Sequence, residues 1–292
     1  MTAVLPRRGD PHDRTPRRQP PAARSGVRIG RIGAVALGLV SAIGLVAFVW
    51  PLVVAPESGF AHSADGPWLF VLLVPLLLLV VAAEIADGGI DAKAVAMLGV
   101  LGAVGAGLRV LGAGMSPLEP LFFLLILAGR AFGPAFGFVF GSLTLLAGAL
   151  VTGGVGPWLP FQMLGASWVS MGAGLLPRVR PRAERWLLAG YAMLASFAYG
   201  LLLDLWFWPF LALTTGGSDL AYVAGAPLGD NLSRFAVFHL LTGLGWDIPR
   251  ALLSAALCLL IGPAVLTGLR RAARRAAFTA PVAVAEPTQD RS

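Results

Sequence analysis

The stretch from Glu119 to Pro177 constrains the fold most, because it is hydrophobic enough for a membrane yet carries regularly spaced glycines. These glycines, one at every fourth residue, are Gly129, Gly133, Gly137 and Gly141. On a helix this spacing places one glycine per turn on a single face, where the backbone of a second helix can pack closely. The stretch therefore predicts a multi-helix membrane protein with a packed interior.

The composition supports a membrane protein and argues against nucleic-acid binding. Hydrophobic residues make up 57% of the chain and charged residues 13%, whereas soluble domains carry about 25% charged residues. The formal charge of +7 comes from basic clusters before Arg31 and at 270–275, which suit the flanks of membrane spans and contact with lipid headgroups. Cys258 is the only cysteine, so disulfides and thiolate metal sites are excluded.

The hydrophobic runs predict an all-α integral membrane protein with about eight spans. A helical span needs roughly 20 apolar residues, and the run 119–152 is too long for one span. Arg130 and Pro134 interrupt this run, so we predict a short helix, a turn and a second helix. The predicted spans are 32–53, 68–86, 94–113, 119–129, 134–152, 161–177, 186–209 and 247–268.

The distribution of charge predicts the orientation. With a cytoplasmic N-terminus, all but Arg109, Arg234 and Arg250 of the 22 Lys and Arg residues lie on the cytoplasmic side, as the positive-inside rule requires. We therefore expect a multi-pass protein of the plasma membrane with both termini in the cytoplasm. The predicted organisation is a disordered basic tail at 1–28, a transmembrane hairpin at 29–90, a six-helix core at 91–275 and a disordered tail at 276–292.

Two charged residues inside predicted spans are the first candidates for a binding site. Arg109 lies in the outer half of the third span and Asp204 in the outer half of the seventh. Intramembrane charges are costly and usually line a cavity or a pathway. A second interpretation is that Arg109 extends toward the outer surface or pairs with Glu119.

Outer aromatic and amide side chains are the second group of candidates. Trp158 and Gln162 belong to one predicted loop, and Trp206 and Trp208 end the seventh span before an expected external loop at 211–245. Such groups suit a small-molecule pocket, but tryptophans also gather at any membrane interface.

Two further patterns have structural explanations. Asp247 is expected to cap the last helix and to pair with Arg250 one turn later. Small residues, including Ala92 and Ala96, share one face of the third span. This face permits close packing, either within the chain or against a partner helix.

The catalytic and metal-binding motifs that we sought are missing from the sequence. The chain has no phosphate-binding GxxxxGK[ST] loop, so it is not itself an ATPase. Its three histidines lie in separate segments without metal-ligand spacing. We therefore expect no enzyme activity, no cofactor and no metal.

Several ordered segments between Lys93 and Arg275 resemble the substrate-binding S components of energy-coupling factor (ECF) vitamin transporters, especially an actinobacterial subgroup. These segments are LFFLLILAGRAFGPAFGFVFG, GGVGPWLPFQMLGASWV with GAGLLP, YGLLLDLWFWPF and LGWDIPRALL. The resemblance covers about 180 residues. The first two predicted spans are additional to the six-helix core of that family.

The resemblance implies a ligand-capture subunit of an ATP-driven importer. Such a subunit binds a vitamin or related micronutrient with high affinity, and the loops at 112–118 and 211–245 would close over it. It docks on a transmembrane coupling protein that carries two ATPases, and the Ala-x-x-x-Ala spacing of Ala92 and Ala96 matches the docking face of the family. The similar subgroup is linked with cobalamin, which makes cobalamin one candidate ligand.

The sequence thus leaves two functions open. In the first, Arg109, Glu119, Trp158, Gln162, Asp204, Trp206 and Trp208 contact the ligand, and Ala92 and Ala96 contact the coupling protein. The alternative is a non-catalytic structural or assembly subunit without a small-molecule ligand.

Overall fold

Every regular element in the part of the chain that the structure describes is helical. The computed structural model describes residues 31–53, 77, 79, 92–113, 118–215 and 220–276. Its elements are α1 (Arg31–Phe48), α2 (Trp50–Val53), α5 (Ala92–Ala113), α6 (Leu121–Phe132), α7 (Pro134–Thr152), α8 (Leu159–Leu175), α9 (Pro181–Thr215), α10 (Leu228–Phe238), η3 (His239–Gly243), α11 (Leu244–Leu260) and α12 (Gly262–Ala276). The prediction of an all-α membrane protein is confirmed.

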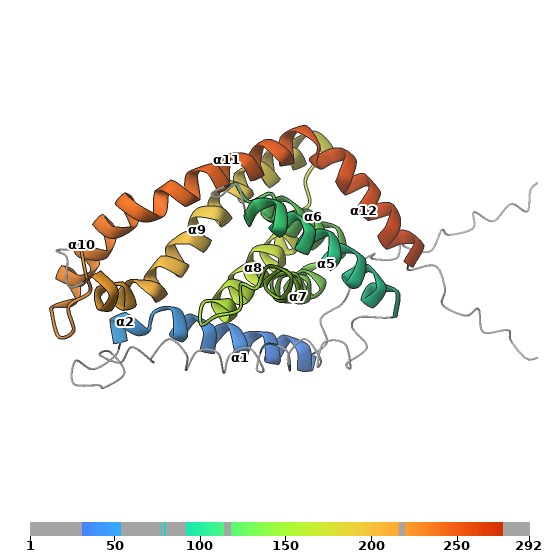
Figure 1. Ribbon diagram of the computed structural model, residues 1–292. Coiled ribbons are helices and arrows are strands. Elements are labelled where there is room, and N and C mark those ends of the chain that lie inside the picture. Colours follow the sequence, from blue (N-terminus) through green and yellow to red (C-terminus); the bar gives the residue numbers. More distant parts are fainter. Residues whose placement is uncertain are drawn as a thin grey trace, which may run out of the picture.

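Helices α7 and α8 lie at the centre of the structure and are packed closely together (Figure 1). Helix α5 packs on α7, and α6 packs on both central helices. Helices α9 and α11 form a long pair on one side, α1 runs along the other side, and α12 descends against α6 (Figure 1). The core consequently includes residues from α1 as well as from the central helices.

The predicted interruption between 129 and 134 is confirmed. Helix α6 ends at Phe132, and α7 begins at Pro134. Gly133 between them has a φ of 99°, which favours glycine because a Cβ would be strained there. Pro134 occupies the first turn of α7, where its missing N–H costs no helical hydrogen bond.

The regularly spaced glycines bring α8 into backbone contact with α6 and α7. A Cβ on Gly129 would meet the carbonyl oxygen of Ser170, and a Cβ on Gly141 would lie 2.5 Å from the Cα of Ser167. The hydroxyl of Ser167 is 2.7 Å from that of Ser142 on α7. The predicted close packing is therefore confirmed within the same chain, between α8 and each of α6 and α7, while Gly133 forms the break between α6 and α7.

Four described helices are long and apolar enough to cross a membrane, namely Lys93–Leu111, Pro134–Thr152, Pro181–Phe210 and Leu228–Leu260. Two shorter apolar helices are Gly33–Phe48 and Leu121–Phe132. The predicted span at 68–86 lies outside the described residues, apart from Leu77 and Leu79. So do both predicted tails, except for residue 276. The count of eight spans stays a prediction.

The expected external loop at 211–245 is wrong over much of its length, because the chain is helical from Leu228 onward. Phe235 and Phe238 lie on one face of α10 and are buried. Phe235 packs against Trp208 with ring centroids 5.4 Å apart. This aromatic contact stabilises a helix in a segment that was expected to be a loop.

The expected span at 247–268 also differs, since α11 begins at Leu244 and ends at Leu260. Gly262 opens the separate helix α12. In α12 the exposed residues include Arg271 and Arg274, while Leu266 and Leu269 are buried. The basic cluster at the end of the chain therefore belongs to an amphipathic helix rather than to the end of a span.

The N-terminal helix α1 is joined to the core by aromatic contacts. Phe48 is fully buried, and its ring lies 4.9 Å from that of Phe161 on α8. The indole of Trp50 stacks near Phe210 and donates a hydrogen bond of 3.3 Å to the carbonyl oxygen of Trp206. Helix α1 is thus part of the folded unit, although the sequence suggested only a plain hairpin.

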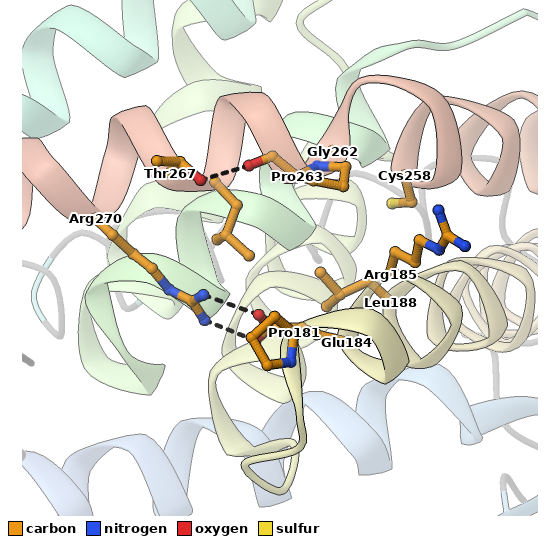
Figure 2. A pocket seen from close by; sticks show the side chains of 10 residues that line it. Pro181, Glu184, Arg185, Leu188, Cys258, Gly262, Pro263, Thr267 and Arg270 are labelled. Atoms are coloured by element: carbon orange, nitrogen blue, oxygen red, sulfur yellow. Dashed lines mark hydrogen bonds and ion pairs between the residues drawn. The ribbon is translucent and has the colours of Figure 1, made fainter.

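One buried carboxylate joins three helical segments at the end of the molecule where α6 turns into α7. Glu184 accepts hydrogen bonds from Arg130 (2.8 Å) and from two nitrogens of Arg270 (2.6 and 2.8 Å). Figure 2 shows the Arg270 contact beside a pocket between α9 and α12. This pocket has a volume of about 90 Å³, well below the roughly 300–1,000 Å³ of typical ligand pockets.

Candidate functional site

The ion pair that the sequence suggested for Arg109 is present near the end of α5. The guanidinium Nη2 of Arg109 donates a hydrogen bond of 2.7 Å to the side-chain oxygen of Gln162 at the start of α8. Its Nη1 lies 4.0 Å from a carboxylate oxygen of Glu119. Gly148 on α7 makes room for this side chain, because a Cβ there would meet the Cδ of Arg109.

Arg250 on α11 lies on the other side of Glu119. Its Nε is 3.4 Å from the second carboxylate oxygen of Glu119, and its Nη1 is 2.9 Å from Asp247. The guanidinium also lies over the rings of Phe122 and Tyr199, at 5.2 and 5.1 Å from the ring centroids. Cation–π contacts of this kind strengthen when water is excluded.

Asp247 does not cap a helix, contrary to the sequence prediction. Helix α11 begins three residues earlier and continues from the π-helical turn η3. The side chain of Asp247 is 1% exposed and faces α9 rather than solvent. The predicted pairing with Arg250 is confirmed, but it is a buried pair inside the helix bundle.

His239 connects Asp247 to Asp204 on α9. Its Nδ1 is 2.7 Å from a carboxylate oxygen of Asp204, and its Nε2 is 3.9 Å from Asp247. Eight residues of ideal α-helix exceed two full turns by about 80°. The extra residue of the π-helical turn η3 reduces the angle about the helix axis by about 100°. The side chains of His239 and Asp247 therefore lie about 20° apart around the helix.

Two glycines allow these polar side chains to lie between α9 and α11. A Cβ on Gly200 would meet the carboxylate of Asp247. A Cβ on Gly243 would meet Asp204 and His239. Small residues at both positions let the helices approach while the polar groups occupy the remaining space.

These contacts form one continuous chain of polar side chains, which we call the polar network. It contains three carboxylates, two guanidinium groups, one imidazole and one amide. Its members are Gln162, Arg109, Glu119, Arg250, Asp247, His239 and Asp204. Opposite charges alternate along it, so each carboxylate lies beside a cationic or titratable group. In the described residues, no cluster of three or more His, Cys, Asp or Glu side chains has the geometry of a metal site.

The three predicted tryptophans lie outside the polar network. Trp206 and Trp208 are 1% and 0% exposed. Trp206 packs on Phe161, and the indole of Trp208 donates a hydrogen bond of 2.7 Å to the carbonyl oxygen of Leu220. Trp158 is 42% exposed and donates to the carbonyl oxygen of Gly154. The structure therefore brings Arg109, Glu119, Gln162 and Asp204 together, while ligand contact by the tryptophans stays a prediction.

The predicted docking face lies at the opposite end of α5 from Arg109. Ala96 is exposed, and in the described part of the chain no atom outside the helix's own backbone lies within 4 Å of a Cβ built on Gly99, three residues later. Ala92 begins the helix, but the position of its side chain lies outside the described residues. Ala96 and Arg109 are thirteen residues apart, which is about 20 Å along a helix.

Sequence reasoning missed three members of the polar network. His239 was placed in a loop, and Asp247 and Arg250 were given a structural role. The spacing of three residues between Asp247 and Arg250 was the available signal, because charges that share the face of a membrane helix indicate a functional site. Recognising it required knowing that the chain is helical before residue 244.

Comparison with known families gives one match. The family described as "ECF transporter, substrate-specific component" matches residues 93–262, which is more than half of the chain. Comparisons with curated proteins and with solved structures gave no significant match. The matched range includes all seven members of the polar network and the exposed face of α5. The chain therefore belongs to the substrate-specific components of ECF transporters, the membrane subunits that capture a vitamin or a related micronutrient.

Proposed function

We propose that this protein is the high-affinity capture subunit of an ATP-driven ECF importer and that the polar network contacts its ligand. The observation that carries this proposal is a buried network of charged side chains at the end of α5 opposite the exposed small-residue face. Charged groups inside a membrane protein are costly and usually serve binding or transport. Cobalamin is our candidate ligand, in keeping with the sequence resemblance.

The proposed partners are a transmembrane coupling protein and two ATPase subunits. In this arrangement both termini are cytoplasmic, and the docking face at Ala92 and Ala96 lies on the cytoplasmic half of α5 in the plasma membrane. The small exposed residues Ala96 and Gly99 support this proposal, because such residues let a second helix approach closely. The polar network then faces the outer half of the membrane.

The docking face is tested by the double substitution Ala92→Glu and Ala96→Glu. Two carboxylates in a helix–helix contact leave unpaired charges at the interface, so we expect association to fall by at least tenfold. The measurement is a pull-down of the tagged protein from native membranes in mild detergent, with bound proteins identified by mass spectrometry. Recovery of a coupling protein and ATPases by the unsubstituted chain is the expected result.

Ala183→Glu is the matched control, because this alanine is exposed at the start of α9. It should leave the recovered complex unchanged. Equal recovery with the Ala92→Glu, Ala96→Glu variant would show that this face is not the docking surface. If an intact and abundant chain recovers no coupling protein at all, the importer assignment itself is wrong.

A further inference from the structure

Both arginines of the polar network are held in place by partners other than Glu119. Arg109 is fixed through Nη2 by the amide of Gln162 at 2.7 Å. Arg250 is fixed through Nη1 by Asp247 at 2.9 Å and by the two aromatic rings beneath it. Each guanidinium therefore keeps its position and still directs another nitrogen, Nη1 of Arg109 or Nε of Arg250, at the same carboxylate.

Glu119, by contrast, is bound loosely between them. Its oxygens lie 4.0 Å from Arg109 and 3.4 Å from Arg250, beyond the 2.7–2.9 Å of a good charge-assisted hydrogen bond. The Nε of Arg250 is buried, and among the described residues it has no partner within hydrogen-bonding geometry. The side chain of Glu119 is also 24% exposed, compared with 16% for Arg109 and 10% for Arg250.

We propose that Glu119 occupies the position of an acidic group of the ligand, and that a carboxylate or phosphate replaces it between Arg109 and Arg250. Guanidinium groups bind such anions in a forked geometry. If Glu119 moves away, the two fixed guanidinium groups leave two positive charges around its former position. An anion bound there would neutralise these charges. This inference rests on the proposed function, since it names the ligand class of the same site.

The inference predicts a preference for acidic ligands over their neutral counterparts. A neutral amide can accept hydrogen bonds from the two arginines but cannot balance their charge. We expect cobalamin, which carries a phosphodiester, to bind at least tenfold more tightly than cobinamide, which lacks the phosphodiester together with its ribose and base. Biotin and biotinamide form a second pair that differs only in the acidic group. A pair whose neutral member binds as tightly as the acidic member would overturn the inference.

A second test does not require knowledge of the natural ligand. In Glu119→Ala, sodium acetate should restore the missing carboxylate and raise the Tm. At ten times the apparent Kd the expected rise is about 3–5 °C, relative to sodium chloride at equal ionic strength. Acetamide should have no such effect, and Arg109→Gln combined with Glu119→Ala should abolish the response to acetate.

Asp230→Ala is the matched control, because Asp230 is an exposed carboxylate in the first turn of α10. Equal effects of acetate on this control and on Glu119→Ala would overturn the inference. If Glu119→Ala does not fold, the inference is tested by the affinities of the unsubstituted protein for the acidic ligands and their neutral counterparts. If the protein recovers the coupling protein but does not prefer acidic ligands, only the inference about the ligand class is wrong. If it prefers acidic ligands but recovers no coupling protein, only the proposal of an importer is wrong.

Discussion

Replacing Arg250 with methionine is expected to destabilise the protein by about 3–5 kcal/mol, because it leaves a buried carboxylate without its partner. Asp247 is 1% exposed and lies 2.9 Å from Arg250. Glu119 would lose the nearer of its two cationic neighbours as well. The measurement is the Tm of the purified protein in detergent, followed by tryptophan fluorescence. A decrease on the order of 10 °C corresponds to this loss.

Two variants separate the loss of the ion pair from the loss of a side chain. Arg274→Met removes an exposed arginine from α12 and should leave the Tm unchanged. Arg250→Met combined with Asp247→Leu removes both charges and should recover much of the loss, since buried ion pairs are often replaceable by apolar groups. If the double variant is as unstable as Arg250→Met, the unpaired charge of Asp247 is not the cause of the lost stability.

Substituting Gly141 with alanine is expected to have the second large effect. The added Cβ would lie 2.5 Å from the Cα and the amide nitrogen of Ser167, so the backbones of α7 and α8 must move apart. Overpacking of a core costs about 1–3 kcal/mol, and more when backbone must shift. We expect a cost of about 3 kcal/mol for Gly141→Ala and loss of folded protein when Gly137→Ala is added. Yield of monodisperse protein and Tm are the readouts.

Gly190 provides the matched control on α9. Within the ranges that the structure describes, no atom outside the backbone of α9 lies within 4 Å of a Cβ built at this position. Gly190→Ala should therefore be neutral, or stabilising by about 0.5–1 kcal/mol through the helix preference of alanine. A similar loss of stability at Gly141 and Gly190 would mean that the α7–α8 contact does not depend on glycine.

The sequence was sufficient for the parts of the fold that depend on local chemistry. Gly133 and Pro134 specify the break between α6 and α7, because one favours a positive φ and the other starts a helix. The regular spacing of the glycines predicted a close helix contact, and the contact is with α8. Arg109 was recognised because a charge in an apolar span is conspicuous, and its neighbour Glu119 was the nearest acid in sequence.

The rest of the site depends on how segments that are distant in sequence meet. His239 aligns with Asp247 through the π-helical turn η3, and Asp204 reaches His239 because Gly243 leaves space between α9 and α11. Neither feature has a simple periodicity in the sequence. The role of Trp206 could not be predicted from the sequence either, because an indole suits a ligand pocket, a membrane interface and a packed core equally well.

The family accounts for the absence of catalytic motifs, since its members are transport subunits that take up a small molecule together with ECF module components. It also agrees with a membrane-embedded chain, as the long apolar helices indicate. The helix α1 lies outside the matched range but contributes Phe48 to the core.

The contacts of Glu184 restrict how the surrounding helices can move relative to one another. Because Glu184 holds Arg130 and Arg270 at once, the ends of α6 and α9 and the basic helix α12 cannot separate without stranding a buried charge. These segments would therefore move as one rigid unit. Glu184 and Asp204 are twenty residues apart on α9, or about 30 Å. A displacement at the Glu184 end would thus be transmitted along one unbroken helix to Asp204 and the polar network.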